Sequence, residues 1–293
     1  MKSNPRRILI AGAGGQLGLA LAAVLGEDPA NELLLYGPAD MDSIKPLDVR
    51  DKDAVSREVR RVQPDVIING AAFTAVDLCE SMEEEAYAVN AEGACNLAAA
   101  AAENGCVLVH ISTDYVFDGT AKEPYTEDSV PNPVSAYGRT KLAGEKAVME
   151  SGADYFLIRT AWLYGEGKNF VRTMLRLSET NPEVRVVADQ YGSPTSALEL
   201  ARMIAFLIQT DEYGLYHGTC EGVTTWYEFA EEIFRLAGKD TKVIPITSDQ
   251  FPSAAKRPAY SVLENKRLNE RFAYRMSSWQ DALAQYMEHE NRR

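Results

Sequence analysis

The chain has 293 residues, and its 46% hydrophobic and 25% charged residues are typical of a globular protein of one or two domains. Acidic residues outnumber basic ones by 43 to 30, which gives a formal net charge of −13. This charge argues against nucleic acid or an anionic membrane as a partner, because both select a basic face. It does not exclude an anionic ligand, since a positive pocket can lie within an acidic surface.

The sequence contains no pattern that would indicate a membrane segment, a secretion signal or a metal site. No apolar run approaches the ~18 residues of a transmembrane helix, and the apolar stretch after the polar residues 1–7 is too short for a signal peptide. The four cysteines form no CxxC pair, and the three histidines lie far apart in the chain. We therefore expect a cytoplasmic protein with reduced thiols, no membrane partner and no metal site.

Short apolar runs alternate with helical patterns through the first two-thirds of the chain. The runs expected to form buried parallel strands are residues 8–11, 33–36, 66–69, 107–111 and 156–159. The helical patterns between them cover residues 17–25, 52–62, 83–104 and 137–150. These repeated strand–helix units predict an α/β fold with a doubly wound parallel sheet of the Rossmann type, to which we assign residues 1–163.

After about residue 160 the spacing of the elements changes. Helices are expected at residues 169–179, 196–209, 225–237 and 278–288, and short strands at 185–187, 216–219 and 243–246. No repeat, low-complexity tract or flexible linker separates the two halves. We therefore expect residues 164–293 to form mainly a smaller α/β substrate-binding lobe, interleaved with a first domain that also uses residues 186–212.

A glycine-rich loop connects the first predicted strand to the first predicted helix. Its GxxGxxG spacing permits a tight turn, a close approach of the backbone to a pyrophosphate and close packing of the helix on the strand. The helix N-terminus adds free amides and the positive end of its dipole. A purely structural turn is the alternative, but the strand before the loop and the helix after it favour a dinucleotide site. We assign Gly12, Gly15, Gln16, Leu17 and Gly18 to the binding of NAD or NADP.

The segment after the second predicted strand should meet the adenosine half of this cofactor. Asp40 and Asp42 are candidates for an acid on the adenosine ribose, and no arginine stands beside them to neutralise a 2′-phosphate. The pattern places neither aspartate securely, so NAD and NADP both stay open. Asp48 and Val49 are positioned to meet the adenine, whereas Asp51 is expected to cap the following helix.

Polar side chains stand at the ends of the later strands, where a doubly wound sheet binds its ligand. Ser112 and Thr113 end the fourth strand and point to opposite sides, so only one of them can face the ligand. Tyr137 and Lys141 are four residues apart and share one face of a helix. A phenol becomes an effective acid–base group near neutral pH when a lysine ammonium and a positively charged nicotinamide favour the phenolate. Tyr137, Lys141 and Thr113 are therefore the predicted catalytic residues, and Lys141 can also hold the nicotinamide ribose.

Further motifs continue this pattern along the chain. They are Gly15-Gln16-Leu17-Gly18, Ser112-Thr113-Asp114-Tyr115-Val116-Phe117-Asp118-Gly119, Tyr137-Gly138 with Lys141, Arg159-Thr160-Ala161-Trp162-Leu163-Tyr164-Gly165, Asp189-Gln190-Tyr191-Gly192-Ser193-Pro194-Thr195, and Arg257-Pro258 before Ser261-Val262-Leu263. Together they resemble the extended short-chain dehydrogenase/reductase superfamily, which modifies nucleotide sugars. From near the start of the chain to about residue 265 they resemble the dTDP-4-dehydrorhamnose reductase family within it, to which the last two motifs are specific.

The resemblance implies NAD(P)H-dependent reduction of the C4 ketone of dTDP-4-dehydro-L-rhamnose, which gives dTDP-L-rhamnose. Hydride would pass from the nicotinamide to the sugar carbonyl, and Tyr137 would supply the proton. Lys141 would lower the tyrosine pKa and bind the ribose, and Thr113 would tune the pair. The resemblance further implies cofactor contacts at Ala72, Phe73 and Thr74, and sugar-nucleotide contacts at Thr113, Asp114, Trp162 and Arg257.

Some of these assignments have a structural alternative. Without the resemblance, Trp162 is better interpreted as a core residue, and Arg257 as the partner of a surface acid. Some members of the family are thought to dimerise through glutamates on a magnesium ion. Glu199 falls where one such glutamate would lie, but Ala20 stands where another is expected. A bound magnesium ion is therefore open but not expected, and a monomer and a homodimer are both compatible with the sequence.

Other functions are compatible with the same elements. An epimerase, or a different reductase acting on another nucleotide sugar, would share the fold and the cofactor. A non-catalytic regulatory subunit, like the β subunit of methionine adenosyltransferase, would keep the nucleotide site but would not need Thr113, Tyr137 and Lys141. Both predicted ligands are diphosphates, so we expect a locally positive cleft within the negative surface, formed by the loop amides, Lys141 and Arg257.

Overall fold

The long apolar runs form the central strands of a parallel sheet, as expected for strands that are buried on both faces. In the computed structural model, which describes residues 5–40 and 43–290, this sheet has seven strands. They are β1 (Arg6–Ala11), β2 (Asn31–Gly37), β3 (Lys45–Pro46), β4 (Val66–Asn69), β5 (Val107–Thr113), β6 (Tyr155–Thr160) and β11 (Gly214–His217). Their order is β11-β6-β5-β4-β1-β2-β3, and all neighbours are parallel. The predicted doubly wound α/β fold is confirmed.

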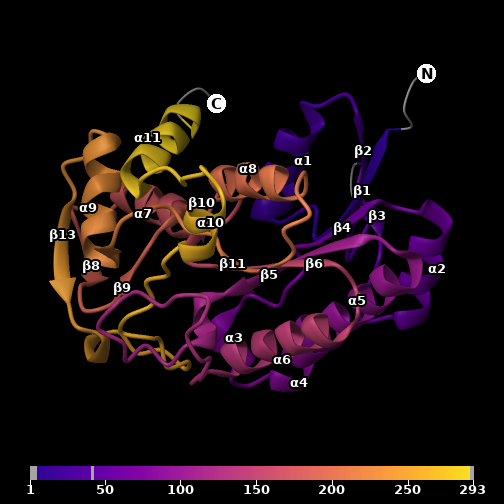
Figure 1. Ribbon diagram of the computed structural model, residues 1–293. Coiled ribbons are helices and arrows are strands. Elements are labelled where there is room, and N and C mark those ends of the chain that lie inside the picture. The colour runs from indigo at the N-terminus through magenta and orange to yellow at the C-terminus, as the bar shows by residue number, and fades with distance from the viewer. Residues whose placement is uncertain (1–4, 41–42, 291–293) are drawn as a thin grey trace.

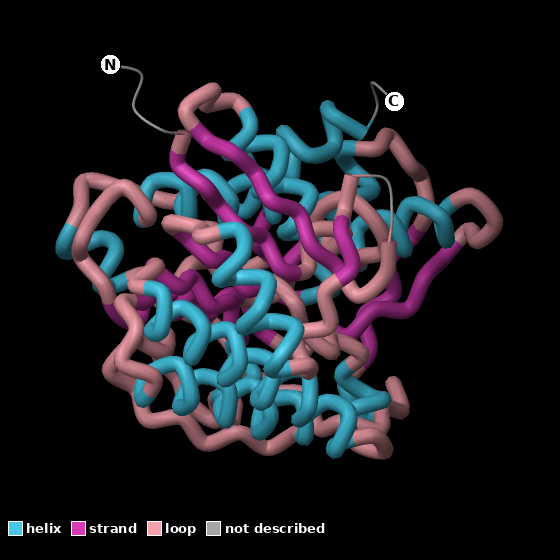
Figure 2. The backbone as a smooth tube through the Cα atoms, turned by 90° about the vertical axis from the view of Figure 1, so that its right-hand side faces the viewer, coloured by secondary structure: helices cyan, strands magenta, loops and turns pink. Residues whose placement is uncertain are grey.

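Helices cover both faces of the sheet (Figure 1). One face carries α1 (Gln16–Gly26) and α8 (Ala197–Leu207), which contact each other. The other face carries α2 (Lys52–Val62), α5 (Gly93–Asn104) and α6 (Ala136–Glu150), packed beneath the strands in Figure 2. Each face has its own apolar core, so the helices hold the carboxyl ends of the strands in fixed positions.

The helix expected at residues 83–104 is interrupted by a wider turn. It consists of α4 (Glu83–Tyr87), a π-helical turn (Ala88–Glu92) and α5. The turn contains Asn90, which is 1% exposed and whose side chain bonds to the loop after β4. This bonding partner is remote in sequence, so helical periodicity alone could not indicate the interruption. Such π turns are frequent at functional sites.

The second lobe lies on the left of Figure 1. Its elements are α7 (Phe170–Ser178), β8 (Glu183–Val187), α9 (Trp226–Leu236), β13 (Lys242–Ile246) and α11 (Trp279–Glu290), with the short α10 (Lys266–Arg271) beside β11. A separate apolar core lies between α7, α9 and α11. Short ladders pair β7 (Leu163–Tyr164) with β10 (Thr195–Ser196), and β9 (Tyr191–Gly192) with β12 (Thr224–Thr225).

The two lobes share segments of the chain. After the first strands of the second lobe the chain returns to form α8 and β11, which pack on α1 and on the edge of the large sheet. The division into residues 1–163 and 164–293, with 186–212 used by the first domain, stays a prediction.

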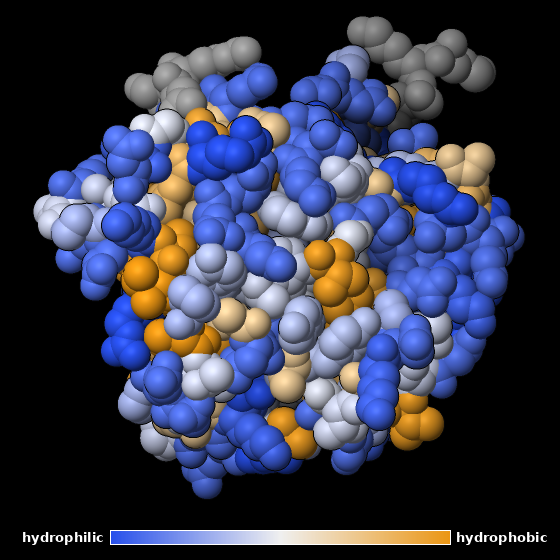
Figure 3. Space-filling model, turned by 90° about the vertical axis from the view of Figure 1, so that its left-hand side faces the viewer, coloured by the Kyte–Doolittle hydropathy of each residue, from blue (hydrophilic) through white to orange (hydrophobic). Residues whose placement is uncertain are grey.

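The face that carries the second lobe is mostly hydrophilic, and its hydrophobic residues form small separate patches (Figure 3). Among the described residues, none of the helices combines the length and the apolar character needed to cross a membrane.

Candidate active site

The glycine loop lies at the carboxyl edge of the sheet, between β1 and α1. Gly12 has a φ of +81°, and a Cβ at this position would lie 2.7 Å from the nitrogen of Ala71. A Cβ on Gly18 would lie 2.3 Å from the carbonyl oxygen of Gly12, so α1 packs directly on the loop. Gly15 caps α1 without a side-chain hydrogen bond, and the first turn of α1 has no acidic residue. The amides and the positive dipole end of α1 therefore face the glycine loop with no acidic side chain of the first turn beside them, an arrangement that fits the pyrophosphate of a dinucleotide.

The predicted adenine contacts differ in their surroundings. Val49 is buried, and a Cβ on Gly93 would lie 2.6 Å from its Cγ2, so Val49 packs against the start of α5. The Asp48 carboxylate is exposed and forms a bidentate pair with Arg50, with Nε–Oδ1 and Nη2–Oδ2 distances of 2.9 and 2.6 Å. Hydrogen bonding to Arg50 lowers the pKa of Asp48. Asp51 accepts a hydrogen bond from the nitrogen of Ala54 and caps α2, as predicted.

The candidates for the adenosine ribose are only partly described. Asp40 is exposed just beyond β2, and Asp42 lies outside the described residues. Lys45 and Arg57 line a cavity of about 340 Å³ beside Tyr36, near the end of β2. These two basic side chains were not predicted, because one lies on a short edge strand and the other on α2. NADH and NADPH both remain compatible with this end of the site.

The end of β5 decides which hydroxyl faces the predicted ligand site. The Ser112 hydroxyl donates to Oε1 of the buried Glu145 on α6, at 2.5 Å. Thr113 points to the other side of the strand, donates to Oδ1 of Asp114 at 2.9 Å, and interacts with the phenol of Tyr137. Of the two alternatives left open by the sequence, Thr113 is therefore the hydroxyl beside Tyr137.

Helix α6 places Tyr137 and Lys141 one turn apart. A Cβ on Gly138 would lie 2.1 Å from the carbonyl oxygen of Tyr115, so α6 begins directly against the turn that follows β5. Lys141 is 2% exposed, and its Nζ donates to the carbonyl oxygen of Ile111 at 2.7 Å. The lysine of this pair is thus tied to the same strand that ends in the predicted hydroxyl group.

Burial moves the pKa values of this pair in opposite directions. It raises the pKa of Tyr137 above the ordinary 10; the Asp114 carboxylate raises it further, and the hydrogen bond with Thr113 opposes the rise. Burial lowers the pKa of Lys141 to about 8, against the effect of Glu145. The resemblance implied that Lys141 lowers the tyrosine pKa, but the protein by itself keeps the phenol protonated. That Lys141 lowers the pKa of Tyr137 stays a prediction for the complex with a positively charged nicotinamide.

Asp114 is a buried carboxylate next to these groups. It is 2% exposed, and its Oδ2 is buried without a hydrogen bond to any described residue. Burial raises the pKa of Asp114 to about 6, although the hydroxyls of Ser261 and Thr113 lie close enough to lower it. An unpartnered carboxylate oxygen at this position can accept a hydrogen bond from a ligand hydroxyl.

The predicted cofactor contacts Ala72, Phe73 and Thr74 follow β4. Phe73 packs in the same apolar cluster as Tyr137. Its backbone is held by Asn90, whose Oδ1 accepts from the Phe73 nitrogen at 2.8 Å and whose Nδ2 donates to the Phe73 oxygen at 3.3 Å. Asn90 was not predicted as a site residue, because only the fold brings its π turn against this loop.

A cavity of about 860 Å³ lies in the second lobe. Its basic lining residues are Arg185, Lys256 and Arg257, its acidic ones Asp189 and Asp249, and its aromatic ones Phe170, Trp226 and Phe251. Only Arg257 was predicted as a site residue, since the others are dispersed over α7, β8 and the residues after it, α9 and the segment after β13. The basic and aromatic groups suit a ligand that carries both phosphates and a ring.

Arg257 connects this cavity with the residues around Tyr137. Its guanidinium pairs with both carboxylate oxygens of Asp77 on α3 (Val76–Cys79), at 3.2 and 2.8 Å. Asp77 also accepts a hydrogen bond from the nitrogen of Ala255 at 3.0 Å. Tyr115 interacts with Arg257, and its ring lies edge-on to that of Tyr137 at 5.4 Å. Arg257 therefore has an acidic partner, as its structural alternative requires. Through Tyr115 it also lies between the cavity and Tyr137, the predicted proton donor.

The sequence model of the RmlD substrate binding domain family matches residues 6–292. The chain belongs to this family. A dTDP-4-keto-6-deoxy-D-glucose reductase from Streptomyces niveus is 42% identical over 282 residues, which cover 95% of this chain and 96% of the relative.

Solved structures agree with this family assignment. A dTDP-4-dehydrorhamnose reductase from Clostridium acetobutylicum superposes with a TM-score of 0.93 at 46% identity, covering 97% of this chain and 99% of that one. The dTDP-4-dehydrorhamnose reductase of Bacillus anthracis, solved in complex with NADP, gives a TM-score of 0.90 at 40% identity, with 97% and 99% covered. The resemblance inferred from the motifs is confirmed.

In this RmlD family member, Trp162 is not part of the fully buried core. It is partly exposed, two residues beyond β6, and its ring stacks on that of Trp226 with 3.6 Å between centroids and 7° between planes. Its position at the carboxyl edge is compatible with the predicted contact to the sugar nucleotide.

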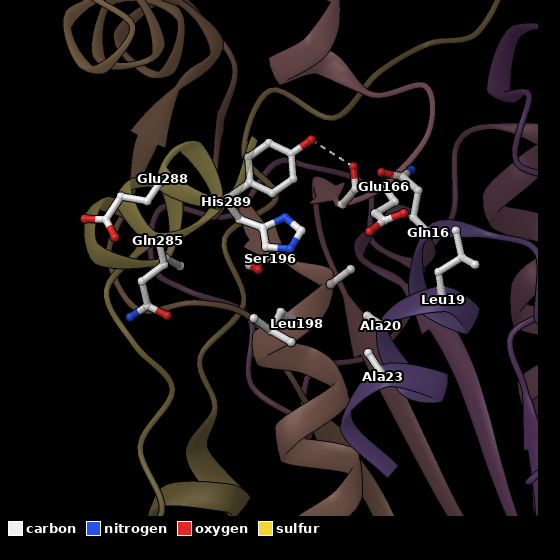
Figure 4. A pocket seen from close by; sticks show the side chains of 14 residues that line it. Gln16, Leu19, Ala20, Ala23, Glu166, Ser196, Leu198, Gln285, Glu288 and His289 are labelled. Atoms are coloured by element: carbon white, nitrogen blue, oxygen red, sulfur yellow. Dashed lines mark hydrogen bonds between the residues drawn. The ribbon is translucent and has the colours of Figure 1, made fainter. Parts of the chain in front are cut away.

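A smaller pocket of about 320 Å³ lies between α1, α8 and α11 (Figure 4). Gln16 and Ala20 line it, but none of the predicted catalytic residues does.

Glu199, the candidate magnesium ligand, pairs with Arg202 at 2.5 Å and accepts a hydrogen bond from the nitrogen of Ser277 at 3.3 Å. Within the described part of the chain, His, Cys, Asp and Glu side chains form no group of three or more that could hold a metal ion.

Proposed function

We propose that this protein is an NAD(P)H-dependent oxidoreductase that reduces the C4 ketone of dTDP-4-dehydro-L-rhamnose to give dTDP-L-rhamnose. The observation that carries the proposal is the placement of Thr113, Tyr137 and Lys141 at the carboxyl edge of the sheet that also carries the glycine cradle, with Arg257 linking this edge to the 860 Å³ cavity. The name of a relative that shares 46% of its sequence with the chain supports the sugar nucleotide as substrate.

The catalytic groups divide the work of the reduction. The reduced nicotinamide, when bound, supplies a hydride to the carbonyl carbon. Tyr137 keeps its proton until negative charge develops on the carbonyl oxygen, and then donates it. Thr113 orients the phenol and the carbonyl through its hydroxyl group. Lys141 is protonated below its pKa of about 8, so its charge stabilises the phenolate that remains and its Nζ can bind the ribose.

The remaining predicted residues bind the two ligands. Gly12, Gly15, Gln16, Leu17 and Gly18 would hold the pyrophosphate of the cofactor, Asp48 and Val49 its adenine, and Ala72, Phe73 and Thr74 its nicotinamide half. Arg257, together with Arg185 and Lys256, would neutralise the diphosphate of the substrate. Asp114 and Trp162 would contact the sugar.

The test is a turnover assay with the purified full-length protein. With dTDP-4-dehydro-L-rhamnose we expect the loss of one NADPH or NADH per product formed, followed by the decrease of the absorbance of the reduced cofactor. The same assay with dTDP-4-keto-6-deoxy-D-glucose and with a UDP-linked 4-keto sugar measures the choice of sugar and base. Sugar conversion without net consumption of reduced cofactor would show an epimerase, and absence of conversion with every sugar would refute an enzymatic role.

We also propose that the reaction takes place in the cytoplasm. All four cysteines are unpaired, and only Cys95 is exposed, which is typical of a reducing compartment. Fractionation of cells that contain the tagged protein tests this location.

A further inference from the structure

Two short strands bring a second tryptophan against Trp162. The antiparallel pair β9–β12 places Gly192 opposite Thr224, and Trp226 follows directly as the first residue of α9. The helix start is fixed by a capping box in which Thr225 Oγ1 accepts from the Glu228 nitrogen and the Glu228 carboxylate accepts from the Thr225 nitrogen, at 3.1 and 3.0 Å. The position of the Trp226 ring is therefore set by backbone pairing and by the cap, not by a flexible loop.

Trp162 itself is held in an unfavourable backbone conformation. Its φ is +47°, in the left-handed region that a bulky non-glycine residue rarely adopts. Its ring fills the space above Gly192, where an added Cβ would lie 2.4 Å from Cε2 of the indole. Its carbonyl oxygen accepts a hydrogen bond from the Thr195 nitrogen at 3.2 Å. Strained residues that are held from several sides in this way cluster at functional sites.

The stacked pair reaches from the catalytic edge into the cavity. Trp162 stands two residues after Thr160, which is the register partner of Thr113 in the β5–β6 pair. Trp226 lines the 860 Å³ cavity, and it also contacts the rings of Phe170 and Phe229, with 4.6 and 6.4 Å between centroids. The two stacked indoles thus extend from the carboxyl end of β6, next to the strand that ends in Thr113, to the cavity that is the predicted binding site of the nucleotide.

We propose that Trp226 is a positioning residue for the sugar ring, because it holds Trp162 in the orientation in which its indole supports the substrate beside Tyr137. The proposal rests on the proposed function. It adds a residue from another part of the chain to the sugar site, and it explains why position 192 requires a residue without a side chain. Gly192 has no positive φ, so only the space under the indole, and not the backbone conformation, excludes a larger residue.

The test compares Trp226→Ala, Trp226→Phe and Gly192→Ala with the full-length wild type. Trp226→Ala should raise KM for the dTDP-4-keto sugar about two- to tenfold and leave KM for NADPH unchanged, because Trp162 loses the ring that supports it; aromatic pairs contribute about this factor. Trp226→Phe keeps an aromatic ring at this position, so its KM for the dTDP-4-keto sugar should stay close to the wild-type value. Gly192→Ala should raise the same KM by a different route, because its Cβ displaces Trp162.

A spectroscopic measurement shows whether the stack itself is lost. Stacked indoles couple their electronic transitions, so the wild type should show an exciton couplet in the far-ultraviolet circular dichroism that both alanine variants lack. Trp279→Phe, which changes the third tryptophan in the core of the second lobe, is the matched control and should retain the couplet.

The outcomes separate the inference from the function it rests on. If the wild type converts the sugar, and the couplet is lost in Trp226→Ala or in Gly192→Ala without a change in KM for the sugar, the inference is overturned. If the wild type converts no dTDP-sugar, the proposed function fails, and binding of the dTDP-sugar to wild type and Gly192→Ala, measured by calorimetry, then decides the role of the stack. Gly192→Ala keeps the test usable if Trp226→Ala does not fold.

Discussion

At the scale of single residues, burial gives Tyr137 and Lys141 complementary protonation states. It raises the pKa of the phenol and lowers the pKa of the ammonium to about 8. Near neutral pH the phenol therefore keeps its proton, while the lysine is close to its titration point. A phenol of this kind donates its proton only to a strongly basic oxygen, such as the one that forms as hydride reaches a ketone.

Tyr137→Phe removes this proton without changing the shape of the ring. We expect kcat to fall by at least about 100-fold, since general acid catalysis contributes that much or more. The affinity for NADPH, measured by fluorescence titration, should not change. Tyr155→Phe is the matched control, because Tyr155 starts β6 at the opposite edge of the sheet. Turnover that survives unchanged in Tyr137→Phe would contradict the assignment of Tyr137 as the proton donor.

Asp114→Asn should stabilise the ligand-free protein in a pH-dependent way. The pKa of Asp114 is raised from 3.8 to about 6, so between these values the folded state binds more protons than the unfolded state and stability falls as pH rises. Above about pH 6 the buried charge destabilises the fold by about 2–3 kcal/mol, at 1.36 kcal/mol per pKa unit. Urea unfolding should show this gain for Asp114→Asn at about pH 8 and a smaller gain at about pH 5. An equal gain at both pH values would mean that charge is not the cause.

At the scale of elements, the glycines of the first strand–loop–helix unit lack a side chain for different physical reasons. Gly18 is required by packing, because its Cβ would lie 2.3 Å from the Gly12 oxygen. Gly15 has more room, with the same oxygen 3.3 Å from its Cβ and a φ of −81°, so its lack of a side chain is better explained by the close approach of the cofactor. Gly26, at the other end of α1, meets only Leu33 Cδ1, at 3.7 Å.

Three alanine substitutions test these reasons. Gly18→Ala should destabilise the fold by several kcal/mol, because α1 must move away from the loop. Gly15→Ala should unfold at nearly the wild-type urea concentration but lose affinity for NADPH. Gly26→Ala should stabilise α1 by about 0.5–1 kcal/mol, the difference in helix propensity. Equal losses of stability in Gly15→Ala and Gly18→Ala would contradict a separate role of Gly15 at the pyrophosphate.

At the scale of the whole molecule, the net charge of −13 and the predicted diphosphate ligands oppose each other. The cavity has three basic lining residues, Arg185, Lys256 and Arg257, and two acidic ones, while Asp77 pairs with Arg257. We expect Arg185 and Lys256 to supply the positive charge that attracts a diphosphate there. The rate at which an anionic substrate associates then depends on whether the negative potential of the whole surface or the positive potential of the cavity dominates along its approach.

Lys256→Gln tests this local field. We expect it to slow the association of dTDP about two- to fivefold at low ionic strength and to have little effect at high salt, where charges are screened. Stopped-flow quenching of tryptophan fluorescence measures the rate, and Lys242→Gln on β13, outside the cavity, is the matched control. A wild-type association rate that increases with salt would show that the global negative charge dominates.

Much of the fold and part of the site could be predicted from local patterns. Buried parallel strands are continuous apolar runs, and a glycine loop between a strand and a helix has few other uses. A tyrosine and a lysine four residues apart on one helix share a face whatever the helix packs against. The helical stretch predicted at 83–104 is confirmed in its bounds, but the π turn around Asn90 within it could not be predicted, because this turn bonds to a loop that lies remote in sequence.

The sequence by itself determined the order of the main strands and helices of the large sheet, and it predicted the nucleotide loop and the pair of Tyr137 and Lys141, since each depends on residues within one turn or one strand end. The tertiary structure alone decided that Thr113 and not Ser112 faces Tyr137, because the choice depends on Glu145 on a later helix. It also assembled Arg185, Trp226 and Lys256 into one cavity. These side chains have no spacing in common, and the pKa values of the site follow from burial, which only the folded chain creates.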